Sequence, residues 1–216
     1  MPATRLRESY VVPMATEARR APDGTLYLRS PYPLGPYAAK ITERLDLWAE
    51  RVPDRTFLAV RDSEFRWQRL TYGQALARVR PLAQALLDRG LSQERPIAIL
   101  SGNGTEHALL ALAAMYAGVL YAPIAPAYSL QARDYGTLGQ IFQLLQPGLV
   151  FAADGARFAA ALASVLPKGV ELVTSLSTPE GMAATPLAEL EATPVTPQVD
   201  EAHARVNPDT IAKILF

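Results

Sequence analysis

The 216-residue chain has no cysteine, only two histidines and no excess charge of either sign. Without cysteine, the chain forms no disulfide, carries out no thiolate catalysis and builds no cysteine-ligated zinc or iron–sulfur site. His107 and His203 stand far apart and show no ligand spacing, so no metal site is expected. Lys plus Arg and Asp plus Glu both number 21, and no segment interleaves basic with aromatic residues. A nucleic-acid partner is therefore not expected.

Long apolar runs are also missing. No stretch approaches the roughly 20 consecutive apolar residues of a membrane span. Residues 1–10 mix charged and polar side chains and lack the apolar core of an export signal. We therefore expect a cytoplasmic protein that makes no membrane contact. Half of the residues are hydrophobic, which is enough for one sizeable core.

The first 40 residues predict a hairpin followed by an extended arm. Asp23 and Gly24 separate two segments of extended character, and this dipeptide between strands is a strong hairpin signal. Residues 30–36 contain three prolines and a glycine, which suits an arm lying on the surface. We therefore treat residues 1–40 as a separate N-terminal hairpin and proline-rich arm.

Residues 41–175 predict an α/β subdomain. Apolar spacing of three and four residues predicts helices at 41–52, 72–89, 106–117, 130–146 and 155–165. Strands are predicted at 56–60, 65–70, 95–100, 119–122, 148–152 and 170–173. The apolar run at 95–100 lacks the alternation of a half-solvated strand and is typical of a parallel strand covered on both faces. The order predicts a mostly parallel sheet with helices on both faces.

The composition changes after this subdomain. Residues 176–209 are rich in Thr, Pro, Ala and Glu and predict a proline-rich surface connection with one short helix at 187–191. We expect this connection to be too polar to own a core. Residues 210–216 turn apolar again and predict the start of another buried strand. Such an end would fray or would pair with a second copy of the chain.

The strand at 119–122 leads to the first place where a ligand is expected. Pro123 and Pro126 disfavour both a continuing interior strand and an immediate helix, which predicts a stiff loop that carries Tyr128 and Ser129. Ligands of open α/β sheets bind beyond the carboxyl ends of the strands. The same pattern is also an ordinary connection between a strand and a helix, so it does not define a function alone.

A Gly-x-Gly turn follows the strand at 95–100. Such a turn can offer backbone N–H groups to a phosphate. The third glycine of a dinucleotide fingerprint would fall at His107, and no carboxylate follows at the distance of about 20 residues that binds the ribose. We therefore disfavour NAD binding and expect Asn103 or Thr105 to cap the next helix.

The remaining charged groups have simple interpretations. His107 and His203 have no obvious Ser or Asp partner in the sequence. We therefore expect each to lie on the surface or to cap a helix. We expect the arginines of the helix at 72–89 to form its solvated face. They are Arg78, Arg80 and Arg89. Arg133 and Asp134 are adjacent and are expected to form an ion pair, although they could also receive an anionic ligand.

Three motifs resemble, in order and spacing, the N-terminal core of the AMP-forming acyl-CoA synthetases of the adenylate-forming superfamily. They are residues 70–76 (LTYGQAL), 98–103 (AILSGN) and 116–129 (YAGVLYAPIAPAYS). Residues 207–216 resemble the strand that leads, in this family, into a phosphate loop rich in Thr, Ser and Gly. The arm at 23–36 is similar to that of bacterial feruloyl-CoA synthases.

The resemblance implies a two-step ligase. A carboxylate attacks the α-phosphate of Mg-ATP to give an acyl-adenylate and pyrophosphate, and the thiolate of CoA then displaces AMP. ATP, Mg²⁺ and CoA would serve the full-length enzyme, with a small aromatic acid such as ferulate as substrate. The family's principal catalytic groups correspond to positions beyond residue 216, so none is assigned here. We expect this chain alone to be inactive, to bind none of these ligands tightly, and to have the rest of its own polypeptide as partner.

Four residues are candidates for the wall of the acyl and CoA cleft: Ser101, Asn103, Tyr128 and Arg133. No residue is assigned to catalysis or to a metal. Two other classes of function stay open. One is a self-standing α/β module that binds a nucleotide or a protein without chemistry, and the other is an interaction scaffold that uses the proline-rich arm.

Overall fold

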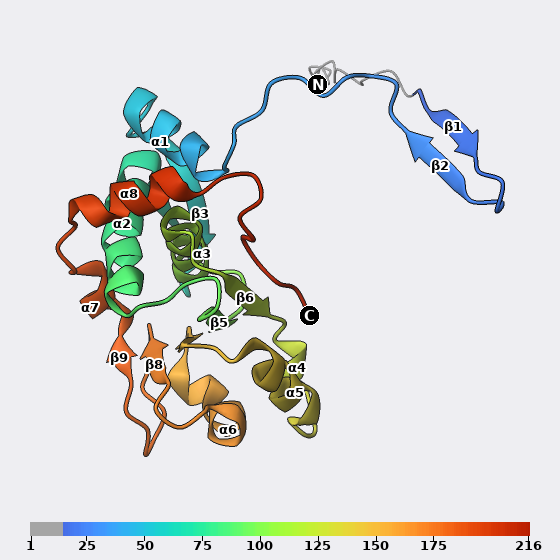
Figure 1. Ribbon diagram of the computed structural model, residues 1–216. Coiled ribbons are helices and arrows are strands. Elements are labelled where there is room, and N and C mark those ends of the chain that lie inside the picture. Colours follow the sequence, from blue (N-terminus) through green and yellow to red (C-terminus); the bar gives the residue numbers. More distant parts are fainter. Residues whose placement is uncertain (1–14) are drawn as a thin grey trace, which may run out of the picture. The chain divides into compact units, whose positions relative to one another are not determined.

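A computed structural model describes residues 15–216, which fall into two compact units with a division after Tyr37 (Figure 1). The first unit contains an antiparallel hairpin of β1 (Glu17–Arg20) and β2 (Leu26–Arg29). Gly24 in its turn has φ 89°, a left-handed conformation that glycine adopts without strain. The predicted hairpin is therefore confirmed.

The second unit, Ala38–Phe216, is built on a five-stranded parallel sheet with the order β6-β5-β7-β8-β9. The strands are β5 (Ile97–Leu100), β6 (Tyr121–Ile124), β7 (Leu149–Ala152), β8 (Glu171–Thr174) and β9 (Thr185–Pro186). A separate antiparallel pair consists of β3 (Thr56–Arg61) and β4 (Trp67–Thr71). The predicted parallel sheet is confirmed.

Helices cover both faces of this sheet (Figure 1). The core on one face includes residues of α2 (Tyr72–Asp88), α3 (Thr105–Ala117), α7 (Leu187–Glu191) and α8 (Pro197–Arg205), together with Leu45 of the first helix. The core on the other face contains α5 (Gly136–Leu145) and α6 (Gly155–Val165). In addition, α1 (Thr42–Arg51) packs against α2. Among residues 15–216, no helix combines the length and the apolar character that crossing a membrane requires.

The ends of the two central helices follow from local sequence. Thr71 and Gln74 form a capping box that begins α2, with the Thr71 side chain accepting from the Gln74 N–H at 3.2 Å. The helix continues through Pro81 to Asp88. At the end of α3, Gly118 has φ 71°, the left-handed conformation in which glycine commonly ends a helix.

The structure corrects the prediction for the segment after β6. Pro123 lies within β6, and α4 (Ala127–Leu130) begins directly after Pro126, so the expected stiff loop is a short helix. The helix predicted from residue 130 begins only at Gly136. An edge strand of the main sheet tolerates proline, and the φ of −55° at Pro126 already suits a helix start.

The segment 176–209 is also more ordered than the sequence suggests. The helix expected at 187–191 is present as α7, but the structure adds β9 and α8. Val199 and Ala202 of α8 are buried, and Val199 belongs to the core formed with α2 and α3, so the segment adds to that core without owning one. Two apolar residues spaced by three positions are enough to dock a short helix that is otherwise polar.

The last residues lie along β6 and not in the interior. The Tyr121 N–H donates to the Ala212 carbonyl at 3.4 Å, and the Ile214 N–H donates to the Tyr121 carbonyl at 3.1 Å. Tyr121 and Lys213 form a parallel bridge. The prediction of a buried strand is wrong, because residues 211–216 are exposed along the edge of β6. We call residues 206–216 the tail segment.

Gly155 gives a direct test of the packing around α6. A Cβ atom on Gly155 would lie 2.3 Å from the backbone oxygen of Ser177 and 2.6 Å from Cδ of Pro179. We predict that Gly155→Ala lowers the free energy of unfolding by about 2 kcal/mol or more, because the backbone must shift to relieve the overlap. Urea unfolding followed by circular dichroism measures this change.

The matched control is Gly139→Ala within α5, where an added Cβ has no neighbour within 4 Å. This change is expected to stabilise the chain by about 0.5–1 kcal/mol, the difference in helix propensity between the two residues. Equal stabilities for the Gly155 variant and the unmodified chain would contradict the packing described here.

Candidate functional site

The four residues predicted for a cleft wall lie after the carboxyl ends of β5 and β6. Ser101 follows β5 and is buried, and Tyr128 lies on α4 and packs against the core. Asn103 and Arg133 lie in the connections that precede α3 and α5, and both side chains are exposed. All four therefore belong to the segments that follow these two strands, which is where ligands of parallel sheets bind.

Ser101 makes a contact that the sequence did not reveal. Its Oγ lies 2.7 Å from Nδ1 of His107 and donates to the Gly102 carbonyl at 3.0 Å. The expectation that His107 lacks a serine partner is wrong, because the turn after β5 folds Ser101 against the first turn of α3. The N-cap of α3 is Gly104, and no side-chain hydrogen bond caps this helix. The prediction that Asn103 or Thr105 caps it is therefore wrong.

Two oxygen atoms surround Nδ1 of His107. Besides Ser101 Oγ, Nδ1 lies 3.2 Å from the Gly102 carbonyl, which only accepts hydrogen bonds, so this contact is a hydrogen bond in the tautomer that carries the proton on Nδ1. In that tautomer Nδ1 cannot take the proton of the Ser101 hydroxyl. Burial lowers the pKa of His107, the hydrogen bond to Gly102 opposes this shift, and Lys213 adds to it.

A small pocket opens beside this histidine. Its volume is about 260 Å³, and its walls come from β3 and from the first turn of α3. The lining residues are Leu58, Ala59, Val60, Asn103, Gly104, Thr105, His107 and Ala108. Of the four predicted wall residues, this pocket includes only Asn103, so the structure does not gather them around one cavity.

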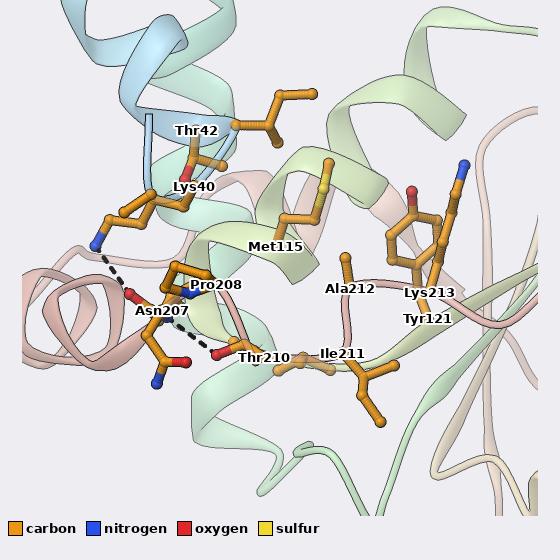
Figure 2. A pocket seen from close by; sticks show the side chains of 15 residues that line it. Lys40, Thr42, Met115, Tyr121, Asn207, Pro208, Thr210, Ile211, Ala212 and Lys213 are labelled. Atoms are coloured by element: carbon orange, nitrogen blue, oxygen red, sulfur yellow. Dashed lines mark hydrogen bonds between the residues drawn. The ribbon is translucent and has the colours of Figure 1, made fainter. Parts of the chain in front are cut away.

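A larger cavity of about 380 Å³ lies at the other end of α3 (Figure 2). Three segments enclose it: the residues before α1, the end of α3 with the start of β6, and the tail segment. The lining residues are Ala39, Lys40, Ile41, Thr42, Met115, Gly118, Val119, Tyr121, Val206, Asn207, Pro208, Thr210, Ile211, Ala212 and Lys213. Nothing in the sequence pattern pointed to this cavity, because its walls come from segments far apart in the chain.

The tail segment is held over this cavity by polar contacts. The Lys40 ammonium donates to the backbone carbonyls of His203 and Val206. The Asn207 N–H donates to Oγ1 of Thr210 at 3.1 Å and closes a local turn (Figure 2). These contacts join the end of α8 to the residues before α1.

The arginines of α2 and its C-cap form ion pairs. The prediction that they form a purely solvated face is therefore wrong. Arg78 pairs with Glu191, Arg80 with Asp200 and Arg89 with Glu171, with shortest N–O distances of 2.6, 2.6 and 2.7 Å. Both nitrogen atoms of each guanidinium fork contact the carboxylate. The side-chain hydrogen bond from Arg80 lowers the pKa of Asp200, and that from Arg89 lowers the pKa of Glu171. The pairs fasten α7, α8 and β8 to α2.

The ion pair expected between Arg133 and Asp134 is not among those of residues 15–216. Asp134 instead accepts a hydrogen bond from the Gly136 N–H at 2.9 Å, at the start of α5. A carboxylate in this position satisfies an N–H group that the helix leaves without an internal partner. The exposed Arg133 side chain is therefore available to solvent or to a ligand.

His203 on α8 is surrounded by partners. Its ring stacks on Tyr116 with centroids 3.8 Å apart, and Nε2 lies 2.8 Å from Oγ1 of Thr42. Asp46 lies 3.8 Å from Nδ1, so the prediction of an unpartnered surface histidine is wrong. Burial lowers the pKa of His203, and Lys40 lowers it further, while Asp46, Glu43 and Asp200 oppose the shift. Burial also raises the pKa of Tyr116 to about 12.

Comparison with known proteins identifies the class to which this fold and edge belong. The family described as AMP-binding enzyme matches residues 45–216, and the chain belongs to this family. The chain is 31% identical over 147 residues to YdaB of Bacillus subtilis strain 168, which is named as an acyl-CoA ligase. The match covers 68% of this chain and 27% of YdaB, so the chain spans about a quarter of that relative.

Solved structures agree with this class. A protein of Rhodopseudomonas palustris titled as a long-chain-fatty-acid CoA ligase is 25% identical, with a TM-score of 0.59 over 73% of this chain and 37% of that one. The fatty acyl-adenylate ligase from L. pneumophila shares the fold at 17% identity, with a TM-score of 0.56 over 82% of this chain and 27% of that one. The chain thus corresponds to an N-terminal portion of the adenylate-forming enzymes.

The environment of His203 predicts a pH-dependent stability. Because its pKa in the folded chain is below the usual value of 6.5, the folded state binds fewer protons than the unfolded state. Its contribution is therefore complete above about pH 6.5 and is lost as the pH falls. We predict that the unmodified chain loses more unfolding free energy between pH 7.5 and pH 5 than His203→Phe, which keeps a ring on Tyr116 but does not titrate.

Urea unfolding at the two pH values measures this difference. Both proteins retain His107, whose titration therefore cancels in the comparison. The same pH dependence in both proteins would show that His203 is not desolvated by its contact with Tyr116.

Proposed function

We propose that the protein containing this chain is an AMP-forming acid–CoA ligase that works through an acyl-adenylate. The match of residues 45–216 to the AMP-binding enzymes carries this proposal. ATP, Mg²⁺ and CoA are the proposed cofactors, and the cytoplasm is the proposed location. An aromatic hydroxycinnamic acid such as ferulate is the proposed substrate, supported by the resemblance of the arm at 23–36 to that of feruloyl-CoA synthases.

The chemistry has two displacement steps. In the first, a carboxylate oxygen bonds to the α-phosphorus of ATP and pyrophosphate leaves. In the second, the CoA thiolate bonds to the acyl carbon and AMP leaves. Both steps depend on positioning and on compensation of phosphate charge. This chain would supply the rigid sheet and one wall of the cleft, and the remaining polypeptide would supply the catalytic groups.

The proposed wall is the edge that carries Ser101, Asn103, Tyr128 and Arg133. Asn103 and Arg133 are exposed there and offer an amide and a guanidinium to a ligand. Ser101 would act indirectly, since its hydroxyl is buried against His107. Tyr128 is partly buried against the core and would form the apolar floor.

The activity test compares two proteins, the 216-residue chain and the product of its complete reading frame. Each is incubated with ATP, Mg²⁺, ferulate and CoA, and AMP and acyl-CoA are measured by chromatography. We expect AMP from the longer protein and none from the 216-residue chain. Octanoate and benzoate replace ferulate in parallel reactions to test the acid preference.

Each outcome bears on a separate part of the proposal. AMP formed by the 216-residue chain alone would contradict its proposed inactivity. A longer protein that uses octanoate better than ferulate would contradict the aromatic substrate. A longer protein that forms no AMP with any acid would favour a non-catalytic module. A concentration-dependent mass of the 216-residue chain would support the proposed dimer.

The proposed wall is tested in the longer protein by Asn103→Ala and Arg133→Ala. Each is expected to raise KM for CoA or for the acid about 10-fold, the effect of losing one hydrogen bond to a charged group. Arg157→Ala, on the exposed side of α6, is the control and should leave KM unchanged. Unchanged KM values in both wall variants would remove these residues from the cleft.

A further inference from the structure

Tyr121 places a polar group in the larger cavity. It is the first residue of β6, it is 6% exposed, and it lines the cavity under the tail segment. The side-chain hydrogen bonds of residues 15–216 do not include its hydroxyl, and this atom is not among the fully enclosed unpaired atoms of those residues, so it keeps contact with solvent. Burial raises the pKa of this phenol, so it keeps its proton at neutral pH and can donate. A ligand atom that accepts a hydrogen bond would satisfy it.

Lys213 is the partner of Tyr121 at the edge of β6. The two residues form the parallel bridge between the tail segment and β6, so their side chains leave the sheet on the same face. Figure 2 shows both side chains extending in the same direction at one end of the cavity. Lys213 forms no ion pair within residues 15–216. A residue with a hydroxyl donor and a residue with an ammonium group thus both line this end of the cavity.

The rest of the cavity is mostly apolar. Met115, Val119 and Ile211 contribute hydrocarbon surface. Thr42, Asn207 and Thr210 add neutral polar groups, and no Asp or Glu is among the lining residues. The other lining cation, Lys40, donates to two backbone carbonyls and is directed toward α8. A volume of about 380 Å³ is within the usual range of small-molecule sites. The cavity therefore combines an apolar body with a single anion-binding end.

We propose that this cavity binds a small monocarboxylate with a short apolar body. The carboxylate accepts hydrogen bonds from the Tyr121 hydroxyl and the Lys213 ammonium, and the body packs against Met115 and Ile211. Charge-assisted hydrogen bonds of this kind are about twice as strong as neutral ones, so the site prefers the anion to a neutral molecule of the same size. The cavity borders the first residue of β6, and the proposed ligase cleft lies beyond the other end of that strand.

Binding is tested on the 216-residue chain without ATP or CoA, so the result does not depend on the proposed ligase activity. Octanoate and 1-octanol are titrated separately at pH 7.5, and binding is followed by two-dimensional NMR of backbone amides. We expect octanoate to bind about 10-fold more tightly than 1-octanol, which has the same chain length without the charge. The amides of Met115, Tyr121 and Ala212 should shift.

Point variants assign the two donors. Tyr121→Phe removes only the hydroxyl, and Lys213→Met removes the charge while retaining the length of the side chain. Each should weaken octanoate binding about 10-fold and leave 1-octanol binding unchanged. Lys168→Met, on an exposed turn before β8, is the matched control and should bind octanoate normally.

A second pair of variants tests the charge without altering β6. Ile211 is 57% exposed, so Ile211→Asp and Ile211→Asn should both fold. The two side chains have nearly the same shape, but the aspartate places a negative charge at the cavity and should weaken octanoate binding relative to asparagine.

Three results would overturn the proposal. The first is equal affinity for octanoate and 1-octanol, and the second is octanoate affinity that Lys213→Met does not change. The third is a set of amide shifts that lies elsewhere, for example around the exposed Leu144. Circular dichroism spectra confirm that each variant is folded before its affinity is compared.

Discussion

The burial of β5 on both faces is the constraint on which this fold depends. Ile97 and Ile99 point into the core with α2 and α3, while Ala98 and Leu100 point into the core with α5 and α6. Fully burying one such aliphatic side chain contributes about 1.5–3 kcal/mol to the stability of the fold. Both helical layers are needed, because each layer buries the side chains of one face of the strand. The strand ends at Leu100, which places Ser101 and the turn that follows at the edge where ligands of parallel sheets bind.

Electrostatic contacts complete this arrangement at long range. The arginines of α2 reach carboxylates of β8, α7 and α8, so that one helix fastens three segments from later in the chain. His203, stacked on Tyr116, adds a fourth connection and links α8 to α1 through Thr42. The balanced charge of the sequence thus reflects specific pairing in the fold as well as a solvated surface.

Local patterns predicted the elements well, because helix periodicity, capping and apolar runs act over few residues. The apolar run at 95–100, of which 97–100 forms β5, is an example. The failures share a different cause. The burial of α8, the partner of His107 and the walls of the larger cavity depend on contacts that only the folded chain brings together. Topology predicted that the four wall residues follow the carboxyl ends of β5 and β6, but no sequence pattern showed that they do not share one cavity.

The tail segment extends the parallel sheet at the edge of β6 through the bridge between Tyr121 and Lys213. Through-hydrogen-bond NMR couplings test this claim most directly. We expect couplings from the Tyr121 N–H to the Ala212 carbonyl and from the Ile214 N–H to the Tyr121 carbonyl. Rapid amide exchange at both positions, with random-coil shifts from residue 210 onward, would contradict it.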